Sequence, residues 1–124
     1  VESNNAYTGE PDADGNIRAV RPGGEPRRVA PGVAMMHIGT TPCGRYFYAD
    51  GARKGRIIVG SPRTGKYIEV CRSQTNNSPQ FGQKAHTHVY LSPDFKWLVF
   101  NSDRTGVPQV YAASMPDGLL KDLE

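Results

Sequence analysis

The chain has 124 residues, 37% of them hydrophobic, and a formal net charge of +3. This length corresponds to one ordinary domain. No apolar run approaches the roughly 20 residues that a membrane-spanning helix needs, so we expect no membrane partner. The 14 glycines and 10 prolines favour many short strands joined by turns.

Short apolar runs bounded by Gly, Pro, Asn and Asp predict an all-β chain, since helical periodicity is almost absent. In chain order, the predicted strands span residues 16–20, 27–29, 33–38, 46–50, 56–60, 67–71, 86–91, 97–101 and 109–113. A long polar loop is predicted over residues 72–84, where the apolar pattern stops.

One sequence unit occurs twice, in residues 37–50 and 88–101, with an offset of 51 residues. The aligned pairs are His37 with His88, Pro42 with Pro93, and Arg45 with Lys96. Four predicted strands in a unit of this length indicate the blades of a β-propeller, although common blades have only about 40–45 residues.

The predicted domain, residues 1–124, divides into parts of three propeller blades. We expect the outer hairpin of a preceding blade in 16–29, a full blade in 33–72 and an incomplete last blade in 86–114. Because a propeller closes with about four to eight blades, two blades leave large apolar faces open. We therefore expect a piece from the C-terminal end of a larger propeller, which requires the remaining blades from the same parent chain or from other chains.

Basic residues are concentrated between Arg45 and Arg72, where seven of them stand against two acidic residues. This excess favours an anionic partner, although a blade edge that resists edge pairing carries the same pattern. No helix-in-groove motif or aromatic-interleaved basic run is present, so we expect no nucleic-acid partner. Cys43 and Cys71 lack metal-binding spacing, and we expect two free thiols, with a disulfide as the alternative. Free thiols favour a cytoplasmic location, with a periplasmic one as the alternative.

The stretch from Tyr90 to Tyr111 resembles the blade repeat of Tol-type propellers. That repeat usually reads Ser-Pro-Asp-Gly-Lys, an apolar strand, Ser-Asp-Arg, a Gly turn and a strand that ends in an aromatic residue. Phe95 stands where Gly is usual, so we expect that turn to differ. The motif indicates a fold and says little about function.

The segment Gln83-Lys-Ala-His-Thr-His88 resembles the metal-binding segment of oligogalacturonate lyases, which are seven-bladed propellers of pectin breakdown. In that family three histidines and a glutamine hold a divalent metal, typically manganese. The resemblance implies that the ligands are His37, Gln83, His86 and His88. It covers roughly residues 30–115 and only the last third of such an enzyme. The family's base, thought to be an arginine, belongs to an earlier blade, so the catalytic residues stay unassigned.

The histidine pattern supports a metal site on its own terms. On a strand, His86 and His88 point to the same face with Cβ atoms about 6.5–7 Å apart, which lets both imidazoles reach one ion. His37 has the equivalent repeat position, and the first strands of neighbouring blades face one central channel. Gln83 precedes the strand and offers an oxygen ligand. Neutral ligands leave the ion its full 2+ charge, which suits a Lewis acid that contacts a carboxylate.

Other prominent side chains have structural interpretations. Asp94 and Asp103 occupy turn positions of the repeat, where we expect them to accept hydrogen bonds from backbone N–H groups. We expect inter-blade packing, and no sugar platform, from Tyr46, Tyr48, Trp97 and Phe100.

The leading hypothesis is a metal-dependent lyase that cleaves oligogalacturonate, an acidic oligosaccharide, by β-elimination. In this reaction a base removes the C5 proton of a uronate, and the C4–O bond breaks to leave an unsaturated sugar. The alternative is a non-catalytic Tol-type propeller that binds a protein partner, with structural histidines. A third possibility is a related lyase that acts on another uronate. We expect the 124-residue chain alone to be inactive, because the base and half of the channel are missing.

Overall fold

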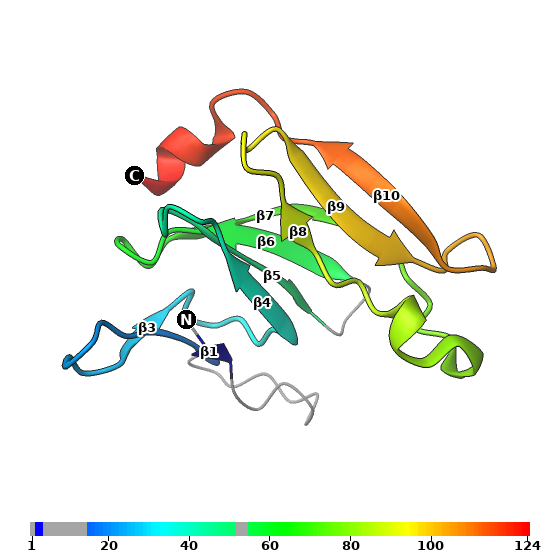
Figure 1. The fold of residues 1–124 in the computed structure, drawn as a ribbon, viewed down its shortest axis with the longest axis horizontal. Coiled ribbons are helices and arrows are strands. Elements are labelled where there is room, and N and C mark those ends of the chain that lie inside the picture. Colours follow the sequence, from blue (N-terminus) through cyan, green and yellow to red (C-terminus); the bar gives the residue numbers. More distant parts are fainter. Residues whose placement is uncertain (1, 4–14, 52–54) are drawn as a thin grey trace.

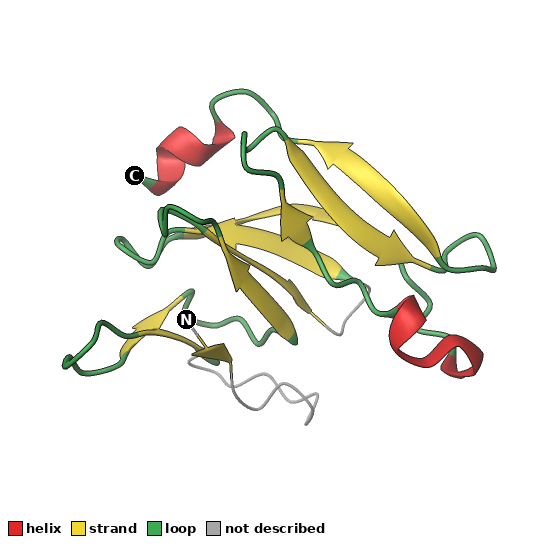
Figure 2. Cartoon of the chain, in the orientation of Figure 1, coloured by secondary structure: helices red, strands yellow, loops and turns green. Residues whose placement is uncertain are grey.

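The computed structural model describes residues 2–3, 15–51 and 55–124. Ten strands and two short 3-10 segments make up this part of the chain, and Figure 2 shows how strands and turns dominate it. The strands are β1 (Glu2–Ser3), β2 (Ile17–Ala19), β3 (Arg27–Val29), β4 (His37–Thr40), β5 (Phe47–Gly51), β6 (Arg56–Gly60), β7 (Tyr67–Arg72), β8 (Tyr90–Leu91), β9 (Trp97–Ser102) and β10 (Gln109–Ser114). The 3-10 segments are η1 (Pro79–Ala85) and η2 (Leu119–Leu123). Neither described helix is long or apolar enough to cross a membrane.

The strands form three antiparallel sheets, each a simple meander. A small sheet pairs β1, β2 and β3, a central sheet runs from β4 to β7, and a last sheet pairs β8, β9 and β10. The central sheet lies between the other two (Figure 1). Strands β2 and β3 lie within 16–29, β4 to β7 within 33–72 and β8 to β10 within 86–114, whereas β1 lies outside the expected ranges. The assignment of residues 16–29, 33–72 and 86–114 to particular blades of one ring stays a prediction.

Successive side chains of the central sheet point to opposite faces, and apolar residues occupy both sets of positions. The sheet is therefore apolar on both faces. One face contributes Tyr48, Ile57 and Val59 to the cluster it shares with Leu91 and Leu98 of the last sheet. The core residues on the opposite face are Phe47, Ala49 and Ile58, which pack with Ile17, Val29 and Met35. All five residues of β5 are buried. A strand buried on both sides is typical of a sheet stacked between neighbours.

The expected inter-blade packing is confirmed for three aromatic residues and wrong for the fourth. Tyr46, Tyr48 and Phe100 are buried in the cluster between the central and last sheets. Trp97 is 46% exposed, because the register of β9 turns it to the outer face of the last sheet while Leu98 points inward.

The Ser92–Lys96 turn keeps the conformation of its repeat partner, contrary to expectation. Phe95 has a φ of 61°, and Gly44, 51 residues earlier, has a φ of 68°. Phe95 therefore adopts the left-handed conformation that favours glycine. Its ring packs edge-on against the ring of Tyr46, with the ring centroids 5.4 Å apart, a contact that glycine cannot make.

Asp94 and Asp103 act differently from each other. Asp94 shapes its own turn as expected, since its Oδ1 accepts hydrogen bonds from the Ser92 hydroxyl at 2.6 Å and the Lys96 amide at 3.1 Å. The side chain of Asp103 also accepts from backbone N–H groups, as expected, but these belong to the distant residues Asn76 and Ser78 and not to its own turn.

Asp103 holds the loop that leads into η1. Its fully buried carboxylate accepts hydrogen bonds from the amides of Asn76 at 2.6 Å and Ser78 at 2.9 Å, and from the Thr75 hydroxyl at 2.7 Å. Thr75 Oγ1 also lies 2.6 Å from the carbonyl oxygen of Ala85, the last residue of η1. Burial raises the pKa of Asp103, but hydrogen bonds from this loop, those of Ser78 first, outweigh burial and hold the pKa well below its usual range.

We expect Asp103→Asn to lower the free energy of unfolding by about 2 kcal/mol at neutral pH, because an amide cannot replace all the accepted hydrogen bonds. Because the pKa of Asp103 is lower in the folded than in the unfolded state, its ionised carboxylate stabilises the fold at pH values above the unfolded-state pKa of about 4. This stabilisation is lost progressively as the pH falls below that value. Urea denaturation followed by circular dichroism at several pH values measures both effects. An equally steep acid loss of stability in the variant would contradict the assignment, and Asp94→Asn is the matched control.

Substitution of Gly39 on β4 tests how closely this strand packs against the ring of Tyr48. A Cβ atom at this position would collide with the ring of Tyr48. We expect Gly39→Ala to lower the free energy of unfolding by about 2 kcal/mol, since the buried ring must move. The neighbouring exposed Thr40→Ala should change it by less than about 0.5 kcal/mol. Equal urea midpoints for the two variants would show that the ring is not confined.

Candidate metal centre

His37 begins β4 and is held by its partner on the adjacent strand. The register of β4 and β5 places His37 opposite Asp50. Nδ1 of His37 lies 2.8 Å from Oδ1 of Asp50, whose side chain is 2% exposed. A carboxylate accepts, so Nδ1 carries the proton and Nε2 has a free lone pair. The imidazole as a whole is 26% exposed, so the ring is partly accessible to solvent.

His86 and His88 lie on an irregular segment between η1 and β8, and the expected strand over 86–91 is wrong for its first four residues. The His86 amide donates to the Gln83 carbonyl at 3.1 Å, which closes η1. His88 has a φ of 43°, outside the range of a strand. Thr87 between them is buried, and its carbonyl accepts from the Asn101 amide at 2.8 Å. These contacts fix the segment without regular pairing.

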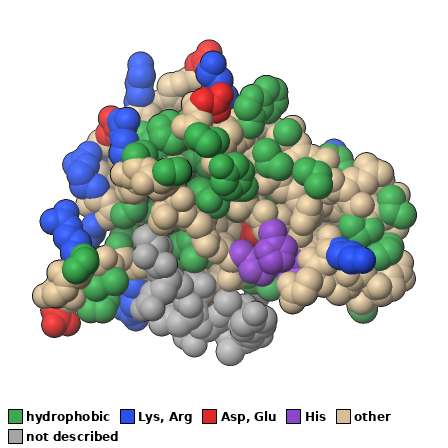
Figure 3. Space-filling view, in the orientation of Figure 1, with side chains coloured by type: hydrophobic (Ala, Val, Ile, Leu, Met, Phe, Trp, Pro, Cys, Tyr) green, Lys and Arg blue, Asp and Glu red, His purple; other side chains and the backbone are tan. Residues whose placement is uncertain are grey.

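The three imidazoles nevertheless come together. The ring centroids of His37 and His88 are 3.9 Å apart and the rings are stacked, while His86 lies 5.6 Å from His37 and 5.8 Å from His88. One nitrogen from each ring falls within 4.8 Å of the others. Two nitrogens each about 2.1 Å from one ion are at most about 4.2 Å apart, so small side-chain shifts suffice for a shared ion. Figure 3 shows the histidines as one patch at the surface.

Two features of the histidine cluster fit metal ligation. Nδ1 of His86 is buried, with no hydrogen-bond partner among the described residues. Such an orphaned polar atom calls for a physical reason, and a lone pair reserved for an ion supplies one. Burial, followed by the proximity of His37 and His86, lowers the pKa of His88 against the opposing effect of Asp50. His88 is therefore neutral near pH 7, as a ligand must be.

Gln83 lies on η1 and is exposed. Its carbonyl binds the His86 amide, which fixes the main chain three residues before the first histidine of the pair. Its role as an oxygen ligand stays a prediction, as does the complete ligand set of His37, Gln83, His86 and His88.

Asp50 is the functional candidate that the sequence reasoning missed. The predicted strands 33–38 and 46–50 enclose a turn near Pro42–Arg45, and an antiparallel hairpin around it pairs His37 with residue 50. That cross-strand pairing was the available signal. A carboxylate on the nitrogen opposite the ligand nitrogen is a frequent partner of metal-binding histidines.

The basic region is largely used in internal contacts. Arg56 and Arg72 both bind Glu69, at 2.5 and 2.7 Å, and Arg45 binds Glu124. Hydrogen bonds to Arg72 lower the pKa of Glu69 against burial, with a further contribution from Arg56. The expected Arg53 and Lys54 contributions lie outside the described residues. These pairs favour the structural interpretation of the charge over an anion-binding surface.

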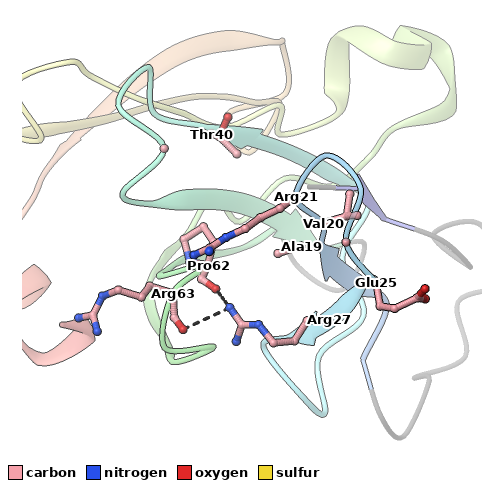
Figure 4. A pocket seen from close by; sticks show the side chains of 10 residues that line it. Ala19, Val20, Arg21, Glu25, Arg27, Thr40, Pro62 and Arg63 are labelled. Carbon is pink, nitrogen blue, oxygen red and sulfur yellow. Dashed lines mark hydrogen bonds between the residues drawn. The ribbon is translucent and has the colours of Figure 1, made fainter.

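A cleft of about 530 Å³ lies at the end of β4 opposite to His37, where Thr40 contributes to its wall. Figure 4 shows Arg27 directed at the carbonyl oxygens of Pro62 and Arg63. The cleft contains none of the three histidines. It is therefore separate from the candidate metal centre.

No protein-family model matches the chain. A curated protein, oligogalacturonate lyase from Dickeya dadantii (strain 3937), is 34% identical over 65 residues, which make up 51% of this chain and 17% of that protein. A solved structure of oligogalacturonate lyase in complex with manganese matches with a TM-score of 0.65 and 28% identity. This match covers 75% of our chain and 26% of the solved one.

The chain thus spans about a quarter or less of the proteins it matches, 17% of one and 26% of the other. The structural match confirms the all-β, propeller-blade fold class predicted from the repeat. The resemblance that began with the Gln83–His88 segment is thereby confirmed, because the chain is similar to oligogalacturonate lyases in both sequence and fold.

Proposed function

We propose that this chain carries the metal-binding part of a metal-dependent lyase that cleaves oligogalacturonate by β-elimination, as in pectin degradation. The convergence of His37, His86 and His88 within 4.8 Å carries the proposal. The relationship to oligogalacturonate lyases, one of them solved with manganese, supports the reaction class. An acidic oligosaccharide is the corresponding substrate.

The donor set fits a divalent cation with unquenched charge. Three neutral imidazoles and the amide oxygen of Gln83 add no negative charge to the site. Imidazole suits several transition metals, and an added oxygen donor accommodates harder ions such as manganese. Such an ion, when bound, supplies Lewis-acid polarisation of a substrate carboxylate, which favours loss of the adjacent C5 proton.

The residues of this chain orient and hold that centre. Asp50 keeps the His37 proton on Nδ1, so Nε2 keeps a lone pair for an ion. The lowered pKa of His88 keeps its imidazole unprotonated near neutral pH. Elimination also needs a base for the C5 proton, and we place that base elsewhere in the propeller. The remaining blades, from the same parent chain or from others, are therefore part of the proposal.

A non-catalytic interaction module is the second candidate. Its supporting observation is the apolar outer face of the last sheet, where Val110 is 71% and Trp97 46% exposed. An exposed apolar face of this kind is typical of a contact surface.

For either function we propose a cytoplasmic location, with a periplasmic one as the alternative, because Cys43 and Cys71 are both free.

Metal binding separates the two candidates. We expect the chain to bind one Mn²⁺ and the His86→Ala, His88→Ala double variant to bind none, because two of three imidazoles are lost. Gln83→Ala should bind at least tenfold more weakly if its oxygen is a ligand. Calorimetric titration with MnCl₂ measures these differences, with Lys84→Ala in the same segment as the control. A wild-type chain that binds no divalent metal would leave the interaction module as the better proposal.

Substrate choice is tested by the ultraviolet absorbance of the unsaturated product. We expect a chain that carries all the blades to release this product from oligogalacturonate, and the 124-residue chain to release none, because we place the base on another blade. Fragments of alginate serve as the control for other uronates. Turnover of alginate alone would shift the proposal to another uronate, and efficient turnover by the 124-residue chain would contradict the placement of the base.

A further inference from the structure

We propose that Asp50 is a positioning residue that uses its two oxygen atoms to fix two different parts of the histidine cluster. Oδ1 accepts from His37, and Oδ2 accepts from the Val89 amide at 3.1 Å. The inference rests on the proposed function in so far as the cluster binds a metal. The hydrogen-bond arrangement itself belongs to the metal-free chain and is tested there.

The first oxygen selects the tautomer of His37. At 2.8 Å from Nδ1, an ionised carboxylate can only accept, so the proton stays on Nδ1. The opposite tautomer would carry its proton on Nε2 and leave that nitrogen without a lone pair for an ion. Asp50 therefore determines which nitrogen of His37 is available.

The second oxygen fixes the main chain next to His88. Val89 follows His88 directly and precedes β8, which begins at Tyr90. Its amide therefore lies outside the strand pairing of the last sheet. The bond to Asp50 supplies the missing acceptor and ties the last sheet to the central one across 39 residues of sequence. It also stabilises the main chain beside the left-handed residue His88, whose φ is 43°.

Burial leaves the Asp50 carboxylate with little access to water. Asp50 is 1% exposed, so its charge must be compensated by donors inside the protein. The observed bonds use one oxygen for each sheet, and no single oxygen serves both partners. Removal of either accepting oxygen should therefore disturb either the His37 tautomer or the His88 segment.

The repeat supplies an internal comparison. The residue 51 positions after Asp50 is Asn101, whose backbone amide binds the Thr87 carbonyl at 2.8 Å. Of these two equivalent positions, only position 50 carries a carboxylate, and its cross-strand partner is His37. An aspartate retained solely for strand pairing has no reason to differ from its counterpart in this way.

Asp50→Asn is the direct test because asparagine has a similar shape but only one accepting oxygen. We expect Mn²⁺ affinity, measured by calorimetry, to fall by about 10- to 100-fold. In ¹⁵N NMR spectra of the metal-free chain, His37 should show the Nδ1–H tautomer in the wild type and a mixture in the variant. Asp50→Glu, which restores two oxygens, should recover the Nδ1–H tautomer.

Asp94→Asn makes the same chemical change in an exposed turn and should alter neither readout. Unchanged affinity and unchanged His37 shifts in Asp50→Asn would overturn the proposal. If that variant does not fold, the wild-type spectrum decides, since an Nε2–H tautomer of His37 contradicts the role of Asp50. A wild type that binds no metal but shows Nδ1–H would refute the proposed function and leave the tautomer assignment standing.

Discussion

The rest of the structure depends on the burial of the central sheet on both of its faces. Phe47 and Ile58 point to one neighbouring sheet, and Tyr48 and Val59 point to the other. Such a sheet is stable only when stacked, because each uncovered face would expose its apolar side chains to water. Stacking in turn places the first strand of one repeat beside the start of the next. The histidine cluster is a consequence of this packing.

The candidate metal centre therefore lies at the boundary between two sheets. His37 comes from the central sheet, while His86 and His88 come from the segment that enters the last one. Hydrogen bonds across this boundary, above all those of Asp50, convert approximate stacking into defined side-chain positions. Asp103 has a comparable role on the far side of η1, where it orders the loop that delivers His86. Two buried carboxylates, Asp50 and Asp103, thus support the position of the histidine cluster.

Local sequence patterns predicted regular strands well and irregular segments poorly. The ranges 27–29 and 56–60 agree with β3 and β6, because both are short segments bounded by Gly and Pro turn residues and β6 is a continuous apolar run. The expected strand 86–91 is reduced to Tyr90–Leu91, and the loop 72–84 contains η1. In both places, hydrogen bonds to distant side chains determine the main-chain path, and such partners are invisible in a local window.

The histidine cluster forms although the strand geometry that predicted it was wrong. The pleat of a strand would place His86 and His88 on one face, but the main chain at His88 is left-handed and the rings still lie 5.8 Å apart. What survives is the register of the repeat, which brings His37 within 3.9 Å of His88. Register depends on the packing of whole sheets, so it tolerates local irregularity better than the orientation of single side chains does. For the same reason we expect metal binding to be testable apart from the proposed elimination, since all the proposed ligands lie on two adjacent repeats and we propose a base elsewhere in the ring.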